Sequence, residues 1–104
     1  MESLDKKEKL NVLFDLYRPL LTERQVLFFE LYYREDYSLS EISDLYSISR
    51  NAIFDHLKKV EDYLIDYENK LHLYALQETR KKLLEDYLNT QDETFLEELR
   101  KLDE

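Results

Sequence analysis

Hydrophobic residues recur every three or four positions along most of the chain, which is the spacing of amphipathic α-helices. A first helix is expected near residues 4–18, with a stripe formed by Leu10, Leu13, Phe14, Tyr17 and Leu21. Pro19 ends this helix or opens the first turn of a new one. A second helix is expected over Glu23–Tyr33, where apolar residues nearly surround the axis and favour packing on several sides.

Two capping boxes indicate where helices begin. Thr22 is followed three residues later by Gln25, and Ser38 is followed by Glu41 at the same spacing. In this motif the hydroxyl accepts an unpaired backbone N–H, and the longer side chain reaches back to the amide of the cap. The second box predicts a short third helix over Leu39–Tyr46.

The stretch from Ser38 to Leu57 has the spacing of a helix-turn-helix, within a core of residues 22–60. Ser47 and Ile48 would form the turn, and the following serine would cap the next helix. A helix-turn-helix presents the first turns of its second helix to the major groove, so the exposed residues there are candidate contacts to nucleic acid or another partner. These are Ser49, Arg50, Asn51, Phe54, Asp55, Lys58 and Lys59.

From the turn onward, apolar residues follow a 3.5-residue period, which predicts one long helix over residues 50–74 of about 37 Å. Two interpretations are open: the stripe is a seam between two copies of the chain, or it packs within one chain. A helix longer than its own small domain favours the homodimer. The stripe comprises Ile53, Leu57, Val60, Leu64, Tyr67, Leu71 and Tyr74.

After Tyr74 the heptad phase is lost, so a break is expected near residues 74–77, followed by a helical extension over residues 76–104. Asn89, Thr90 and Gln91 resemble a turn, and Asp92 a cap for the last helix. The pattern as a whole predicts an all-α fold in a single helical domain of residues 1–104. The last helix would pack through Phe95, Leu96, Leu99 and Leu102.

Composition excludes several classes of function. The chain has no glycine, which phosphate-cradling loops and dinucleotide-binding turns require for close backbone approach. It has no cysteine, which removes disulfides, thiolate metal sites and a cysteine nucleophile. We find no catalytic constellation, and His56 with His72 is too small a ligand set for a metal. A binding protein without enzymatic activity, metal or cofactor is therefore expected.

Charge argues against strong binding to duplex DNA. The formal net charge is −9, and residues 22–66 carry five basic against ten acidic side chains. Duplex binders neutralise several phosphates with Lys and Arg. DNA binding by this chain is therefore expected to be weak. No stretch is apolar and long enough to insert into a membrane, and the start MESLDKKEKLNVL does not resemble a signal peptide. We therefore expect the protein to be located in the cytoplasm.

The segments LLTERQVLFFELYY, YSLSEI, SRNAIFDHLKKVEDYL and DYENKL resemble the YlxM family of bacterial proteins, whose fold is similar to region 4 of sigma factors. The resemblance covers roughly Leu13 to Leu73. It implies a cytoplasmic all-helical protein, usually encoded beside the signal-recognition-particle GTPase, with a role in that targeting pathway. This chain departs from the family pattern at Ser43, where Ala is common, and at Ser47, where Gly is usual.

Three functions remain open from the sequence. The resemblance favours an accessory or regulatory component of the signal recognition particle pathway, with the particle's GTPase or its RNA as partner. A helix-turn-helix also suits a sequence-specific DNA-binding transcription regulator. A structural adaptor that binds no nucleic acid is the third alternative.

Overall fold

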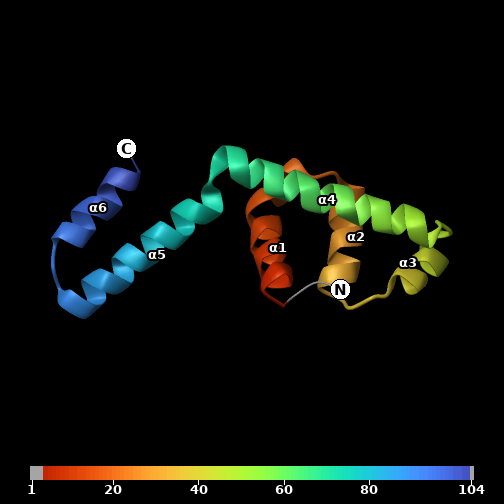
Figure 1. Cartoon of the computed structure of the whole chain (residues 1–104), viewed down its shortest axis with the longest axis horizontal. Helices are drawn as coiled ribbons and strands as arrows, with labels where there is room; N and C mark the ends of the chain where they lie inside the picture. The colour runs from red at the N-terminus through yellow and green to blue at the C-terminus, as the bar shows by residue number, and fades with distance from the viewer. Residues whose placement is uncertain (1–3, 104) are drawn as a thin grey trace. The chain divides into compact units, whose positions relative to one another are not determined.

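The computed structural model describes residues 4–103, which form α-helices joined by short connections (Figure 1). No strand occurs among these residues, and the all-α prediction is confirmed. The helices are α1 (Leu4–Tyr17), α2 (Glu23–Tyr33), α3 (Leu39–Tyr46), α4 (Arg50–Leu71), α5 (Leu73–Thr90) and α6 (Thr94–Leu102), with a 3-10 turn η1 (Arg18–Leu20) after α1.

The chain divides into two compact units, Met1–Lys70 and Leu71–Glu104, where the sequence led us to expect one helical domain. The first unit contains α1 to α3 and nearly all of α4, and the second contains α5 and α6. The helix-turn-helix therefore lies wholly within the first unit.

Both capping boxes form as predicted, which sets the first residues of α2 and α3. Thr22 Oγ1 accepts from the Gln25 amide at 3.2 Å, and Gln25 Oε1 accepts from the Thr22 amide at 2.9 Å. Ser38 Oγ and Glu41 Oε1 exchange the same pair of bonds at 3.0 and 3.1 Å. Each box satisfies backbone N–H groups that have no partner inside the helix.

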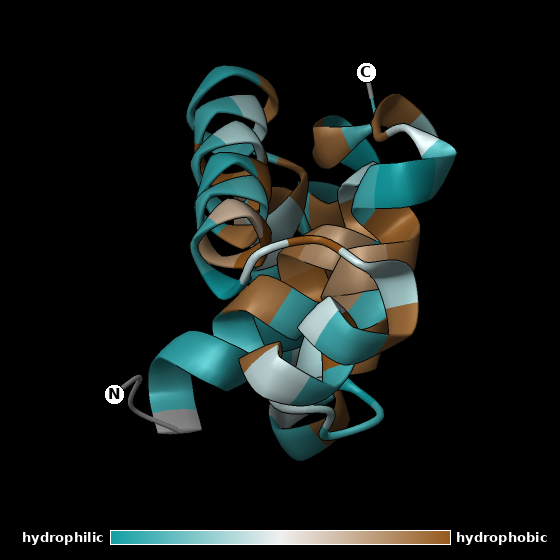
Figure 2. Cartoon of the chain, turned by 90° about the vertical axis from the view of Figure 1, so that its right-hand side faces the viewer, coloured by the Kyte–Doolittle hydropathy of each residue, from teal (hydrophilic) through white to brown (hydrophobic). Residues whose placement is uncertain are grey.

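The core of the first unit lies where its helices meet, and hydrophobic residues gather there (brown in Figure 2). The rings of Phe14 and Phe29 stack at 4.2 Å between centroids, and Tyr33 lies 4.6 Å from Phe29. The side chains of Ile42, Ile53, Val60 and Leu64 are fully enclosed. Burying such side chains is the main favourable contribution to folding.

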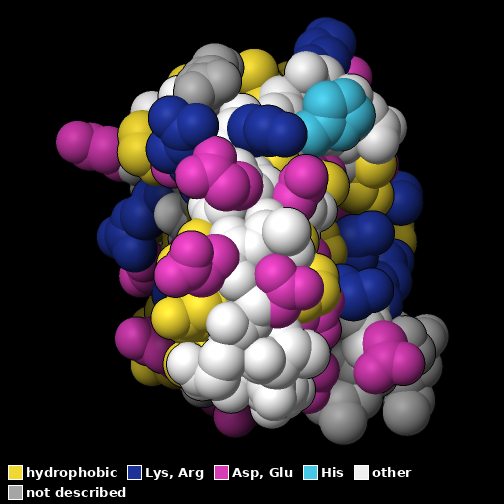
Figure 3. All heavy atoms as spheres, turned by 90° about the vertical axis from the view of Figure 1, so that its left-hand side faces the viewer, with side chains coloured by type: hydrophobic (Ala, Val, Ile, Leu, Met, Phe, Trp, Pro, Cys, Tyr) yellow, Lys and Arg dark blue, Asp and Glu magenta, His cyan; other side chains and the backbone are white. Residues whose placement is uncertain are grey.

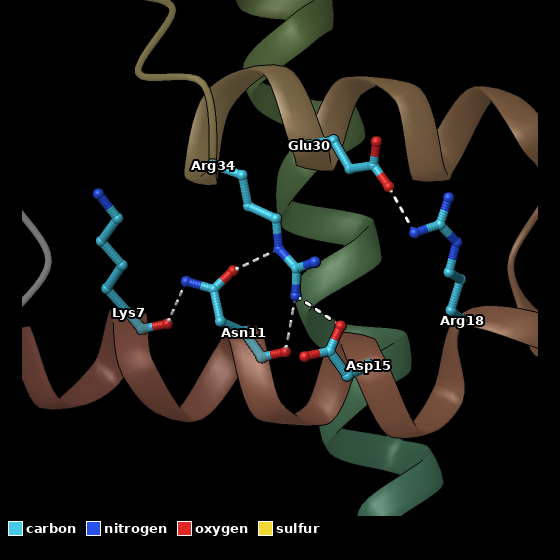
Figure 4. A network of polar contacts seen from close by, with 6 residues as sticks. All are labelled: Lys7, Asn11, Asp15, Arg18, Glu30 and Arg34. Carbon is cyan, nitrogen blue, oxygen red and sulfur yellow. Dashed lines mark hydrogen bonds and ion pairs between the residues drawn. The ribbon is translucent and has the colours of Figure 1, made fainter.

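A polar network joins α1 to the end of α2 at the edge of this core (Figure 4). The Arg34 guanidinium donates to Asn11 Oδ1 at 3.1 Å, to the Asn11 carbonyl at 3.2 Å and to Asp15 Oδ1 at 2.7 Å. Arg18 and Glu30 form an ion pair at 2.6 Å. The planar guanidinium of Arg34 also lies over the Phe14 ring, 4.8 Å from its centroid. Arg34 therefore combines ionic and packing contacts.

Helix α4 ends at Leu71, three residues before the predicted end at Tyr74. His72 follows in the left-handed region with φ 57°, and α5 begins at Leu73. The predicted break at residues 74–77 is therefore wrong by a few residues, and Tyr74 belongs to α5. The last side chain of α4 that is fully buried is Leu64, and beyond it Tyr67 and Glu68 still contact Tyr17 of α1.

In the second unit, α5 and α6 pack against each other as a helical hairpin, and Arg80 of α5 pairs with Asp103 after α6. Asn89 and Thr90 complete α5, so the turn lies later than predicted. Asp92 Oδ1 accepts from the amide and hydroxyl of Thr94 at 3.0 and 2.9 Å, which lowers the pKa of its carboxyl. Asp92 therefore assists the start of α6, one residue before the N-cap Glu93.

None of the side chains of α5 and α6 is fully buried. Leu84, Leu88 and Leu96 are 48%, 60% and 39% exposed, although the pattern assigned Leu96 to the packing face of the last helix. On the face drawn in Figure 3, hydrophobic side chains reach the surface between acidic and basic ones. The hairpin therefore retains apolar surface that its own packing leaves open.

Candidate nucleic-acid interface

The turn between α3 and α4 adopts the conformation that a helix-turn-helix needs. Ser47 lies in the left-handed region with φ 55°, and its N–H bonds to the Ser43 carbonyl. The Ile48 amide also bonds to that carbonyl, at 3.2 Å, and the Ser43 hydroxyl bonds to the Ile48 carbonyl. A non-glycine residue pays a conformational cost here, and these bonds hold the turn in place.

Ser49 is the cap predicted for α4. Its Oγ accepts from the Ala52 amide at 3.1 Å, and its carbonyl accepts from the Ile53 amide. The hydroxyl is thereby directed at the helix terminus. Ser49 consequently orients the first turn of α4, and its side chain is already engaged in a hydrogen bond.

The candidate contact residues at the start of α4 lie together on the surface. Arg50, Asn51, Phe54 and Asp55 are all exposed, and the Phe54 ring is 55% accessible. The Arg50 guanidinium donates to Ser40 Oγ of α3 at 3.3 Å, which links the two helices of the motif on their outer side. We call the surface formed by Ser40 and these four residues the α3–α4 face.

The two lysines that follow differ in their surroundings. Lys58 Nζ lies 3.8 Å from Glu61 Oε2 and 3.7 Å from Asp62 Oδ1. Lys59 is exposed and, among the described residues, forms no ion pair. Neighbouring carboxylates thus offset part of the charge of Lys58, whereas the charge of Lys59 remains available to a ligand.

The first four residues of the predicted seam lie in the core of their own chain. Ile53, Leu57, Val60 and Leu64 are at most 4% exposed, so they offer no apolar surface to a second copy. These four positions agree with the other interpretation of the heptad, in which the stripe packs within one chain. The heptad predicted that this stripe would be buried, but periodicity does not identify what covers it.

The remaining three seam residues differ in their surroundings. Tyr67 is partly buried, and its ring lies 5.9 Å from that of Tyr17 in α1. Leu71 is 50% exposed at the last position of α4, and Tyr74 lies in the second unit. Because four of the seven seam residues are buried within their own chain, a homodimer stays a prediction that would need other surfaces.

Glu61 is a buried residue to which the sequence pattern assigned no role. Its side chain is 5% exposed, accepts a hydrogen bond from the Tyr33 hydroxyl, and lies 3.6 Å from Lys6 Nζ. A signal was present, because Glu61 lies four residues after Leu57 and three before Leu64, on the buried stripe. Buried carboxylates are retained with such partners because an unpaired one is costly.

A shallow groove beside the turn was also missed. It has a volume of about 530 Å³ and lies between α2 and the α3–α4 turn. Its components come from separate stretches of the sequence, so no local pattern could have indicated it. The lining residues are Glu23, Arg24, Leu27, Phe28, Tyr46 and Ile48.

His56 lies on α4, with its ring 5.0 Å from that of Phe28, which lines this groove. Burial lowers the pKa of His56, and the positive charges of Arg24 and Lys59 lower it further. A hydrogen bond with the Arg24 backbone acts in the opposite direction and raises the pKa. The imidazole is therefore held toward its neutral form. Between residues 4 and 103, no three potential metal ligands gather, at His56 or elsewhere.

Comparison with known proteins identifies the family. Residues 4–102 match the model of the family UPF0122, described as "Putative helix-turn-helix protein, YlxM / p13 like". This chain belongs to the UPF0122 family. The resemblance to YlxM proteins drawn from the sequence is thereby confirmed.

Relatives of similar length are found in several bacteria. A UPF0122 protein of Oceanobacillus iheyensis is 50% identical over 100 residues, which are 95% of each chain. The UPF0122 protein YofM of Lactococcus lactis is 41% identical across 97% of this chain and 96% of its own. A UPF0122 protein of Streptococcus thermophilus is 40% identical across 91% of this chain and 87% of its own.

The family description agrees with the geometry of the first unit of this UPF0122 protein. A capped α3, a left-handed turn at Ser47 and a capped α4 form the helix-turn-helix that the description names. In the part of the chain described, no helix has the length and apolar character needed to cross a membrane.

Proposed function

We propose that this UPF0122 protein is an accessory component of the signal recognition particle pathway that binds the particle's RNA through the α3–α4 face. The resemblance to YlxM proteins supports the pathway, and it names the particle's GTPase as a second potential partner. The role of the face rests on a helix-turn-helix that exposes its first turns, as nucleic-acid-binding members of this fold do. Its site of action would be the cytoplasm.

The exposed ring of Phe54 is the observation that carries the choice of RNA. At 55% exposure it lies among polar residues, with Arg50 one helical turn before it and Lys58 one turn after. An accessible aromatic ring between cationic side chains is a platform on which an unpaired base stacks. Bases in duplex DNA are already stacked and paired, whereas RNA loops and bulges display them.

The charge distribution supports the same choice. Duplex DNA is held mainly by contacts to several phosphates, each made by a basic side chain. The α3–α4 face offers Arg50, while Asp55 lies within it and Lys58 is shared with two carboxylates. Stacking depends less on net positive charge, so RNA with unpaired bases suits this acidic protein better than duplex DNA.

Sequence-specific DNA binding is the second candidate. It is favoured by Arg50 and Asn51 at the start of α4, because their side chains can form bidentate bonds to guanine and adenine in the major groove. The bond from Arg50 to Ser40 Oγ keeps the guanidinium beside α3. The two candidates differ in what they require of Phe54 and in their dependence on salt.

We expect the full-length protein to bind the particle's RNA more tightly than a random duplex DNA of equal length, as measured by fluorescence anisotropy. Phe54→Ala should weaken RNA binding about tenfold, since stacking on one base contributes ~1–3 kcal/mol. Tyr63→Ala is a matched control, because Tyr63 is another exposed aromatic residue of α4, at 44%.

Each other outcome has a defined meaning. Tighter binding to the duplex than to RNA would establish the DNA-binding alternative. Binding to the purified GTPase of the particle, unaffected by Phe54→Ala and without RNA binding, would assign a protein partner and refute the RNA-binding role. An RNA affinity that Phe54→Ala and Tyr63→Ala reduce equally would refute the stacking contact.

The homodimer remains part of the proposal, on different surfaces from the heptad seam. Because no side chain of α5 or α6 is fully buried, exposed Leu84 and Leu88 are available for association between copies. Pairing two copies would present two α3–α4 faces, which would double the basic groups that one ligand meets.

A further inference from the structure

Two basic side chains and a histidine gather where α2 passes α4, outside the α3–α4 face. The Arg24 guanidinium lies over the Phe28 ring at 5.3 Å, and the His56 ring meets the same ring edge-on at 5.0 Å. Phe28 is 2% exposed, so it is a fixed support for both. Lys59 follows His56 by three residues and therefore lies on the same side of α4.

The charges of Arg24 and Lys59 are close enough to His56 for both to disfavour its imidazolium form. Arg24 and Lys59 thus both lie near His56, and neither forms an ion pair with a carboxylate among the described residues. Two other arginines of the first unit do form ion pairs, Arg18 with Glu30 and Arg34 with Asp15. A surface that keeps two cations together without an anion is prepared for an anionic ligand.

We propose that Arg24 and Lys59 form a phosphate-binding pair, with His56 as a positioning residue between them, that holds a backbone phosphodiester of the nucleic acid bound at the α3–α4 face. This inference rests on the proposed function and adds the site that would hold the strand beyond Phe54. Lys59 lies five residues after Phe54, about 7.5 Å along the helix axis and about 140° around it. A strand that contacts both residues would therefore pass around α4, across the exposed Asp55.

The chemistry of the pair suits a phosphodiester. The guanidinium of Arg24 presents several N–H donors in a plane, which matches two phosphate oxygens, and stacking on Phe28 limits its freedom before binding. The ammonium of Lys59 adds a mobile point charge. Such contacts fix the register of a strand and read no sequence.

His56 connects the two cations to the fold. Its Nε2 is buried and has no hydrogen-bond partner among the described residues, and its ring packs on Phe28 beside Arg24. A phosphate held by Arg24 and Lys59 would neutralise the charges that disfavour the imidazolium. The groups that face the imidazole are then Arg24 from α2 and Lys59 from α4, with Glu23 lining the adjacent groove.

The test compares Arg24→Gln and Lys59→Gln with Lys9→Gln in the full-length protein, using the particle's RNA and a single-stranded oligouridylate as probes. Lys9 is a matched control, because it is an exposed cation of α1 that also lacks an ion pair among the described residues. Each of the first two variants should weaken binding to both probes by about three- to tenfold. Each should also lower the salt dependence by about 0.7, the value for one phosphate contact to a single strand.

A spectroscopic readout separates this role from a merely structural one. Proton NMR should show the His56 pKa rising when oligouridylate is added to the wild type, and the rise should be lost in Lys59→Gln. Inorganic phosphate alone distinguishes the source of the ligand. We expect it to compete only weakly, since a free ion lacks the stacking contact at Phe54; competition as strong as that of the oligonucleotide would instead assign a site for free phosphate.

The pair is refuted if Arg24→Gln and Lys59→Gln bind like Lys9→Gln while Phe54→Ala weakens binding; the proposed function would then stand without it. If the wild type binds neither probe, both the pair and the RNA-binding role fail. Lys59 is exposed, so its variant decides the matter should Arg24→Gln lower the melting temperature.

Discussion

The hydroxyl of Tyr33 in α2 donates a hydrogen bond to the buried carboxylate of Glu61 in α4. The two residues are 28 positions apart and are 4% and 5% exposed, so the bond joins two helices inside the first unit. Lys6 of α1 lies near the same carboxylate at 3.6 Å. Glu61 therefore connects the helix that carries the α3–α4 face to both helices behind it.

Removing the Tyr33 hydroxyl should destabilise the first unit. A buried hydrogen bond to a carboxylate contributes about 1.5–3 kcal/mol, and Tyr33→Phe should lower the free energy of unfolding by about that amount in urea titrations. Tyr32→Phe is the control, because Tyr32 is only partly buried and its hydroxyl makes no hydrogen bond among the described residues. Equal effects of the two variants would contradict the importance of this bond.

The contact of Arg34 with α1 should depend on the shape of its guanidinium as well as on its charge. Arg34→Lys keeps the charge but loses the planar donors to Asn11 and the contact with Phe14. Since the side chains of Arg34 and Asp15 are 33% and 65% exposed, we expect a loss of only about 0.5–1 kcal/mol. Arg100→Lys, in a more exposed pair with Glu97, should change the melting temperature less.

The sequence was most informative where the relevant chemistry is local. Thr22 with Gln25 and Ser38 with Glu41 predicted the first residues of α2 and α3, because a capping box joins atoms only three residues apart. The turn at Ser47 was found for the same reason. These signals were sufficient to predict the helix-turn-helix and its exposed residues.

Contacts between distant residues set the limit of prediction. The heptad continued through Tyr74, but the helix stops at Leu71, and its contacts with α1 end with Tyr67 and Glu68. The meeting of Arg24 with His56 depends on how α2 passes α4, and nothing in either local stretch indicates it. Glu61 is intermediate, because its position on the buried stripe could have been noticed but its partner Tyr33 could not.

The turn offers a test of local strain. A non-glycine residue in the left-handed conformation costs roughly 1–2 kcal/mol, part of which glycine returns through greater freedom in the unfolded chain. Ser47→Gly, at φ 55°, should therefore raise the free energy of unfolding by about 0.5–1 kcal/mol. Ser47→Ala keeps the cost and should bring no gain, which thermal denaturation of the three proteins can establish.

Association through the second unit would be abolished by charge on its exposed leucines. Leu84→Glu combined with Leu88→Glu places two carboxylates on one side of α5 and should convert a dimer to a monomer in sedimentation equilibrium, with little change in helix content. Leu45→Glu, at another exposed leucine in the first unit, should leave the mass unchanged. A wild type that is monomeric at all concentrations would reject the homodimer.

Stability should fall in mildly acidic solution because of His56. Burial, together with the charges of Arg24 and Lys59, holds its pKa in the folded protein below the ordinary value of 6.5, so the unfolded chain takes up a proton first as the pH falls. The contribution of a neutral His56 is thus present above pH 6.5 and is lost as the pH falls through the folded pKa. His56→Gln should reduce this loss in urea titrations at pH values above and below 6.5. His72→Gln should keep it, because His72 is exposed between α4 and α5, and an equal reduction in both variants would assign the pH dependence to other groups.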